Sequence, residues 1–262
     1  MNDFIGKVAL ITGAGGGIGA ATSLLFARRG AKLSLVDRNE VNLQRVGDEC
    51  VRVGPADTED RPLTVVAELT CEEDVTNLVD ATVKKFGRLD ILVNNAGIYE
   101  LGTIETTSLE QYDRIMAVNV RAAFQLTMLC VPHLIATCGN IVNVSSVAGT
   151  CSVPGEIVYC MSKSAMDQMT RCTALELASK GVRVNSVNPA MIPTSALSRI
   201  GMSDEEQAKF AEHMAQAHPL GRVGDVEEAA QAIAFLASSG SASFITGEHL
   251  HVDGGLHAAC PH

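Results

Sequence analysis

Two residues of the sequence could together move a proton: Tyr159 and Lys163, four positions apart. On a helix this spacing places both side chains on one face. A free tyrosine has a pKa near ~10, and a neighbouring ammonium group favours the phenolate and lowers that pKa. Hydride transfer between an alcohol and a ketone needs such a proton donor, so the pair indicates acid–base chemistry. An exposed helical pair without a function is the alternative.

A glycine-rich segment near the N-terminus could hold a phosphate group. It follows a short apolar run at 7–11 and precedes a helical stretch at 18–29. Glycines permit a tight turn, and the amide groups at a helix N-terminus attract an anion such as a pyrophosphate. This position between a strand and a helix predicts a dinucleotide site at Gly13, Gly15, Gly16, Gly17 and Gly19.

Asp37 stands at the end of the second predicted strand. A carboxylate at this point can accept hydrogen bonds from the adenosine ribose, and it would repel a 2′-phosphate. Positions 14–16 offer no Lys or Arg to offset that repulsion, so NAD is favoured over NADP. Two alternatives stay open: Asp37 as a helix N-cap, and Arg38 as a cation that could swing toward a phosphate.

Alternating strand-like and helical segments would position these residues. Apolar strands that alternate with helices are typical of a parallel sheet covered by helices on both faces. No repeat or linker divides the chain, so we expect one α/β domain over 1–262 with a doubly wound sheet of about seven strands. The expected strands are 7–11, 31–36, 63–69, 89–93, 140–144, 182–187 and 249–252, and the expected helices are 18–29, 40–50, 72–86, 109–137, 157–179 and 225–237.

The segment 190–222 interrupts this alternation with two prolines and two short helix-like pieces, of which 204–217 is the stronger. Long insertions into a compact fold are often lids, which is the favoured interpretation; an oligomer contact is the alternative. Apolar side chains of the segment suit a hydrophobic alcohol or ketone, or they simply pack the lid onto the body. They are Leu197, Ile200, Met202, Phe210 and Met214.

Composition excludes several classes of partner. The chain has 262 residues, 47% of them hydrophobic, and a net charge of -10, so a phosphate backbone and hence nucleic acid is not expected as a partner. No uninterrupted apolar run reaches the ~18 residues of a membrane span, and the N-terminus lacks a signal-peptide pattern. A cytoplasmic globular protein without membrane insertion is expected. Histidines at 249, 251 and 257 suggest a metal only weakly, and none is expected.

The motifs, taken together and in order from Lys7 to about Gly255, resemble those of the short-chain dehydrogenase/reductase family. Ser146, thirteen residues before Tyr159, matches the family's serine, and Ala190 replaces the glycine of P-G-x-x-x-T. The matching positions are Thr12, Gly13, Gly17 and Gly19 for T-G-x-x-x-G-x-G, 94–97 for N-N-A-G, Asn119 for the active-site asparagine, Tyr159 and Lys163 for Y-x-x-x-K, and 189–194 for P-G-x-x-x-T.

The resemblance implies a Rossmann-type fold and an NAD-dependent oxidoreductase that interconverts a secondary alcohol and a ketone. Tyr159 would be the acid/base, and Lys163 would lower its pKa and hold the nicotinamide ribose. Ser146 would hydrogen-bond the substrate oxygen, and Asn119 would hold a water that connects Lys163 to solvent.

The resemblance also implies a set of cofactor-binding residues, in which Glu68 takes the place of a common aspartate and Asn95 is better interpreted as structural. The set is Gly13, Gly15, Gly17, Ile18, Gly19, Asp37, Arg38, Glu68, Leu69, Asn95, Ala96, Gly97, Tyr159, Lys163, Pro189, Ile192 and Thr194.

Assembly and rival functions also follow from the resemblance. A homotetramer or dimer would form through the helices at 109–137 and 157–179 and the last helix and strand. One rival is an NADPH-dependent 3-oxoacyl-[acyl-carrier-protein] reductase, which Asp37 and the lack of Lys or Arg in 129–140 disfavour. The other is a non-catalytic NAD-binding sensor or scaffold, which the filled catalytic positions disfavour. Substrate identity and direction stay open.

Overall fold

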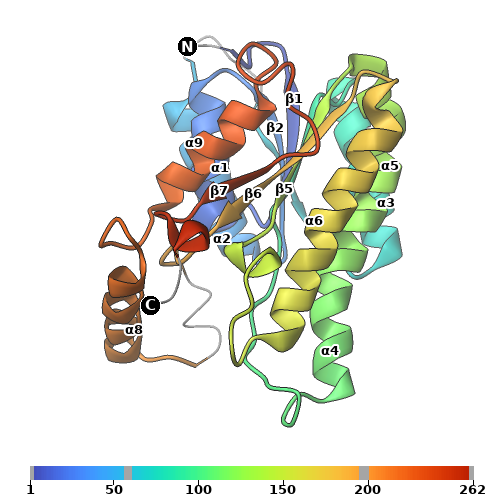
Figure 1. The fold of residues 1–262 in the computed structure, drawn as a ribbon. Coiled ribbons are helices and arrows are strands. Elements are labelled where there is room, and N and C mark those ends of the chain that lie inside the picture. The colour runs from blue at the N-terminus through green and yellow to red at the C-terminus, as the bar shows by residue number, and fades with distance from the viewer. Residues whose placement is uncertain (1–2, 56–60, 195–200, 260–262) are drawn as a thin grey trace.

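A seven-stranded sheet forms the centre of the computed structural model, which describes residues 3–55, 61–194 and 201–259 (Figure 1). All neighbouring strands are parallel, in the order β3-β2-β1-β4-β5-β6-β7. The chain reverses direction across the sheet between β1 and β4, and the crevice beyond their carboxyl ends is where such sheets bind ligands. The strands are β1 (Val8–Thr12), β2 (Lys32–Asp37), β3 (Leu63–Val66), β4 (Ile91–Asn94), β5 (Asn140–Val144), β6 (Arg183–Pro189) and β7 (His249–Val252).

Helices cover both faces of this sheet, which confirms the predicted fold class (Figure 1). Each face has its own apolar core, one around Phe26 and Leu35 and the other around Leu78 and Leu126. The strands contribute side chains alternately to the two cores, which explains their nearly continuous apolar sequences. One face carries α1 (Gly17–Arg28), α2 (Glu40–Val53) and α9 (Val226–Ala237); the other carries α3 (Glu72–Phe86), α5 (Ala122–Thr137) and α6 (Ile157–Ala178).

The predicted helix at 109–137 contains an unexpected turn. Its first part is α4 (Leu109–Met116), a π turn covers Ala117–Arg121, and α5 continues without a break. By length and composition this segment could cross a membrane, but a core helix passes the same test. Its inward side chains, such as Leu126 and Leu134, are buried in the core beside α3.

The predicted lid is described in part. Residues 195–200, which include Leu197 and Ile200, lie outside the described residues. Helix α8 (Asp204–Ala217) begins at a capping box formed by Ser203 and Glu206, and none of its residues is buried. Figure 1 shows α8 set apart from the helices that flank the sheet. Three apolar side chains of the segment are half-buried: Met202, Phe210 and Met214.

Candidate active site

The turn between β1 and α1 has contacts that only glycine permits. Gly13 and Gly17 have φ angles of 64° and 53°, in the left-handed region. A Cβ on Gly19 would lie 2.2 Å from the main-chain oxygen of Gly13. Glycine at this position therefore lets α1 start directly against the turn.

The N-terminus of α1 suits a bound anion. Its N-cap, Gly16, contributes no capping side chain, and the first turn carries no acidic residue. The first amide groups of the helix therefore have no partner from a side-chain cap, and the helix dipole favours negative charge there. A Cβ on Gly16 would meet nothing within 4 Å, so this side of the turn is open. The segment fits a pyrophosphate.

Asn95 fastens the end of β4 to this turn. Its Nδ2 donates to the main-chain oxygens of Thr12 and Gly13 at 2.8 and 3.2 Å. In return, Thr12 Oγ1 accepts the amide groups of Asn95 and Ala96, both at 2.9 Å. Gly97 follows beside the predicted catalytic residues, since a Cβ there would lie 3.3 Å from Asn119 Oδ1. The N-N-A-G motif thus connects the glycine turn with the predicted catalytic residues.

Asp37 lies at the end of β2, against the glycine turn. Its two carboxylate oxygens accept the amide groups of Gly15 and Asn39, at 3.0 and 2.9 Å. The N-cap of α2 is Asn39, whose side chain accepts the amide of Asn42. The N-cap alternative for Asp37 is therefore wrong. Each oxygen keeps capacity for a further hydrogen bond, and the side chain of Arg38 next to it is exposed.

Glu68 and Leu69 lie beyond β3, which ends at Val66 rather than at the predicted 69. The carboxylate of Glu68 accepts the amide and the hydroxyl of Thr70, at 3.2 and 3.1 Å. The amide of Glu68 donates to Asp74 at 2.8 Å. These bonds form the turn into α3, which ends the strand early, and Leu69 packs half-buried against the core.

Four predicted catalytic residues come together where β5, the π turn and α6 meet. Lys163 is only 4% exposed; its Nζ donates to the Val144 main-chain oxygen at 2.9 Å and lies 5.6 Å from the centroid of the Tyr159 ring. Ser146 Oγ donates to the Pro189 main-chain oxygen at 3.3 Å.

Asn119, in the π turn, is fully buried and binds the neighbouring loop. Its carboxamide accepts the Ile98 amide at 2.8 Å and donates to the Ile98 oxygen at 2.9 Å. Its Nδ2 also donates to Ser162 Oγ, at 3.0 Å, on the helix of Tyr159. The side chain therefore fixes the loop after β4 to α6.

Burial controls the pKa values of the acid–base pair. It raises the pKa of Tyr159 to about 12, against a lowering effect of the Ser146 hydrogen bond. It lowers the pKa of Lys163 to about 8, against a raising effect of Asp167. The expected lowering of the tyrosine pKa is therefore not seen in this arrangement, because burial penalises the phenolate as well as the ammonium.

The segment 189–194 is the last of the segments that surround the site. Pro189 ends β6, and its oxygen accepts the Ser146 hydroxyl. Ile192 is buried, and the methyl group of Thr194 lies 3.0 Å from where a Cβ on Gly17 would be. This segment thus joins Ser146 to the glycine turn.

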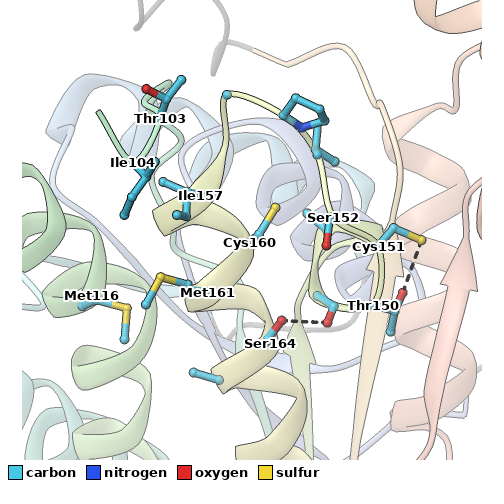
Figure 2. A pocket seen from close by; sticks show the side chains of 16 residues that line it. Thr103, Ile104, Met116, Thr150, Cys151, Ser152, Ile157, Cys160, Met161 and Ser164 are labelled. Carbon is cyan, nitrogen blue, oxygen red and sulfur yellow. Dashed lines mark hydrogen bonds between the residues drawn. The ribbon is translucent and has the colours of Figure 1, made fainter. Parts of the chain in front are cut away.

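A cavity of about 840 Å³ lies beside α6, and Figure 2 shows the side chains that line it. Ile157, Cys160, Met161 and Ser164 line it at helical spacing, whereas Tyr159 and Lys163 do not. Residues 148–154 line it too, and Tyr99 does not. The apolar pattern of α6 does not indicate a cavity on this face.

Sequence reasoning also missed Glu156. The Tyr99 ring meets the Tyr159 ring edge-on, with centroids 5.0 Å apart, and the Tyr99 hydroxyl donates to Glu156 Oε1 at 2.7 Å. Glu156 precedes Tyr159 by three positions, which is the spacing of one helix face and the only available signal.

The C-terminal histidines contact neighbouring protein groups. His249 Nδ1 lies 2.7 Å from Ser186 Oγ, and His257 Nδ1 lies 2.6 Å from Asp253 Oδ2. The rings of His251 and His257 stack at 4.0 Å. Within residues 3–55, 61–194 and 201–259, no group of three His, Cys, Asp or Glu side chains is arranged to hold a metal ion.

Comparison with known proteins gives matches over almost the whole chain. Residues 13–257 match a family model described as enoyl-(acyl carrier protein) reductase. The chain is 40% identical to the 3-oxoacyl-[acyl-carrier-protein] reductase FabG of Thermotoga maritima, covering 96% of this chain and 98% of that protein. It is 39% identical to cyclohexanol dehydrogenase of Acinetobacter sp., covering 97% and 96%.

A solved structure agrees with these matches. The 3-ketoacyl-(acyl-carrier-protein) reductase from Brucella melitensis, complexed with NADH, superposes with a TM-score of 0.85 at 36% identity. The match covers 97% of this chain and 99% of that one.

Proposed function

The chain belongs to the short-chain dehydrogenase/reductase family and is an oxidoreductase that acts on CH–OH groups, and from this premise we propose that it interconverts a secondary alcohol and a ketone with NAD. One observation carries the proposal: Tyr159, Lys163 and Ser146 lie together beside a glycine turn that fits a pyrophosphate. Bound there, the nicotinamide would supply a hydride acceptor for the oxidation of the carbinol carbon and a hydride donor for the reduction of the carbonyl.

Tyr159 is the proposed acid/base. In oxidation its side chain removes the hydroxyl proton of the alcohol, and in reduction it returns a proton to the carbonyl oxygen. Ser146 donates a hydrogen bond to the same oxygen. Its hydroxyl thereby exchanges its present bond to the Pro189 main-chain oxygen for one to the substrate. Lys163 supplies the positive charge that stabilises a developing phenolate and holds the nicotinamide ribose. Asn119 holds the water that connects Lys163 to solvent.

The proposed cofactor contacts begin at the glycine turn with Gly13, Gly15, Gly17, Ile18 and Gly19. Asp37 accepts the ribose hydroxyls with the bonding capacity that Gly15 and Asn39 leave, and it repels a 2′-phosphate. This charge supports NAD over NADP, with Arg38 exposed beside it. The remaining contacts are Glu68, Leu69, Asn95, Ala96, Gly97, Pro189, Ile192 and Thr194, with Tyr159 and Lys163.

The segment 190–222 is the proposed lid over a hydrophobic substrate. Support comes from α8, which has no buried residue and is set apart from the flanking helices. Its half-buried Phe210 and Met214 are apolar side chains with which a lid could cover such a substrate.

We also propose that the protein is cytoplasmic and a homotetramer or dimer. Large apolar side chains remain exposed on α5 and α6: Phe124 at 54%, Met128 at 59% and Leu175 at 81%. Phe124 and Met128 are four positions apart on one face of α5, and exposed apolar patches are typical of subunit interfaces. Light scattering on the purified protein tests the assembly; a monomer at micromolar concentration contradicts it.

A second candidate is the reduction of a 3-oxoacyl group on an acyl carrier protein. The identity to the Thermotoga maritima reductase favours it. Two features count against it. Asp37 is acidic, and the stretch 129–140 has no Lys or Arg with which to bind an acidic carrier.

The test is NADH production by the purified protein against a panel of secondary alcohols, with NADP in parallel and Tyr159→Phe as control. Turnover with NAD that falls at least a hundredfold in Tyr159→Phe supports the proposal. Turnover with NADP alone overturns the cofactor assignment and favours the acyl-carrier reductase. NAD binding without turnover on any alcohol or ketone contradicts the proposed reaction.

A further inference from the structure

Glu156 and Tyr99 form a polar pair beside the proposed acid/base. The Tyr99 hydroxyl donates to Glu156 Oε1 at 2.7 Å, and the Tyr99 ring lies edge-on against the ring of Tyr159. Glu156 is the N-cap of α6, three positions before Tyr159, and Tyr99 contacts both side chains. The carboxylate therefore lies on the side of α6 that carries Tyr159 and Lys163.

Capping of α6 does not explain Glu156. It occupies the N-cap position, where Ser, Thr, Asp or Asn is usual, yet its side chain makes no capping hydrogen bond. Its carboxylate instead accepts a hydrogen bond from Tyr99, which belongs to the loop after β4.

Fastening that loop to α6 does not explain the pair either. Main-chain bonds already join the two segments: Gly102 N–H donates to the Gly155 oxygen at 2.7 Å, and Ile157 N–H donates to the Gly102 oxygen at 3.3 Å. The side-chain pair adds a charged acceptor to a junction that the backbone already holds.

The carboxylate has no cationic partner among the residues that the structure describes. Its one side-chain partner there is the Tyr99 hydroxyl, and Glu156 itself is half-buried. Burial raises the pKa of Glu156, while the bond from Tyr99 opposes this. A carboxylate can accept about four hydrogen bonds, so most of its capacity is left for a ligand that carries donors.

We propose that Glu156, oriented by Tyr99, accepts a hydrogen bond from a second hydroxyl group of the substrate, carried on a carbon close to the reacting carbinol. The proposal rests on the proposed function and narrows it to vicinal diols and their hydroxyketones, whose remaining body is apolar. It also adds a negative charge that disfavours substrates with an anionic group near the carbonyl.

A matched pair of substrates tests the proposal: cyclohexanol and trans-1,2-cyclohexanediol, oxidised with NAD. A hydrogen bond to a charged acceptor is worth about tenfold or more in kcat/KM, so the wild type should prefer the diol by that factor. Glu156→Met should lower the diol-to-cyclohexanol ratio about tenfold, mainly through KM of the diol. Glu156→Gln keeps one acceptor oxygen and should restore part of the preference. Tyr99→Phe should lower the ratio less than Glu156→Met does.

Glu105→Gln is the control, because Glu105 is an exposed carboxylate on the neighbouring loop and should leave the ratio unchanged. An equal loss on both substrates in Glu156→Met, or no preference for the diol in the wild type, overturns the inference while the proposed function stands. Oxidation of neither substrate, nor of any alcohol in the wider panel, overturns both. Thermal unfolding of each variant checks that it is folded.

Discussion

The Nζ atom of Lys163 donates to the main-chain oxygen of Val144 at 2.9 Å, from a side chain that is only 4% exposed. Val144 ends β5 two residues before Ser146, and Lys163 lies one turn after Tyr159 on α6. This bond therefore helps to fix the position of the serine relative to the tyrosine. It does so with a buried ammonium group, which costs folding free energy.

Replacing Lys163 with Met should change the pH dependence of stability. The pKa of Lys163 is lowered from 10.5 to about 8 in the folded protein. Between these values the unfolded chain binds more protons, so the free energy of unfolding of the wild type rises with pH across this window. Below pH 8 the full penalty, about 3 kcal/mol, is present. Relative to Lys163→Met, the wild type should therefore be weakest at pH 7 and should gain stability up to pH 10.5.

Urea unfolding of both proteins at pH 7, 8, 9 and 10 measures this difference. Ionisable groups shared by the two proteins largely cancel in the comparison. Parallel stability curves would show that Lys163 titrates in the folded state as it does in the unfolded chain.

Alanine substitution of the two adjacent serines should distinguish a catalytic role from a structural one. Ser146→Ala removes the proposed hydrogen bond to the substrate oxygen and should lower kcat about a hundredfold or more. Ser145 is buried, and its hydroxyl donates to the Lys163 main-chain oxygen at 3.2 Å. Ser145→Ala should cost about 1 kcal/mol of stability and change kcat less than tenfold. Steady-state kinetics with thermal unfolding measures both effects, and a larger kcat loss in Ser145→Ala would reverse the assignment.

An arginine at position 16 should improve the use of NADP. A Cβ on Gly16 meets nothing within 4 Å, so the turn admits a side chain there without displacing its neighbours. The guanidinium would offset the charge of Asp37 toward a 2′-phosphate. The ratio of kcat/KM with NADP to that with NAD should rise about tenfold or more in Gly16→Arg. Gly16→Ala is the uncharged control, and an equal rise in it would exclude the electrostatic explanation.

Alanine should lower the stability of the protein at position 19 and leave it nearly unchanged at position 16. In Gly19→Ala the new Cβ would lie 2.2 Å from the Gly13 oxygen and 2.5 Å from Asn95 Nδ2, so α1 must move away from the turn. We expect a loss of about 1–3 kcal/mol together with weaker NAD binding. Gly16→Ala should remain within about 1 kcal/mol of the wild type. Urea unfolding and a titration with NAD give the two quantities, and a Gly19→Ala variant as stable as the wild type would contradict the packing argument.

The elements that the sequence predicted best are those with a regular apolar period. The helix expected at 72–86 is α3, Glu72–Phe86, and the strand expected at 249–252 is β7. The strand expected at 63–69 stops at Val66, because Glu68 bonds to Thr70 and Asp74 and forms a turn. Side-chain bonds of this kind leave no trace in the apolar pattern that predicts a strand.

The candidate site was predictable where short spacing places residues on one element, as for Tyr159 and Lys163. The Tyr99–Glu156 bond joins residues 57 positions apart, and no local pattern indicates it. The pKa of Tyr159 was misjudged for a related reason. The sequence shows which charge is near, whereas the burial that raises this pKa to about 12 depends on the packing of the whole site.

The π turn at Ala117–Arg121 acts as a one-residue insertion that keeps a helix in phase with its surroundings. Ile115 and Leu134 are both buried, nineteen steps apart, whereas five ideal α-helical turns take about 18 residues. Without the extra residue, α5 would be rotated by about 100° relative to α4. The same extra residue presents Asn119 to Ile98 and Ser162. A deletion of one residue in this turn would therefore misalign both the apolar face of α5 and Asn119. The length of this helix is constrained as strictly as its composition.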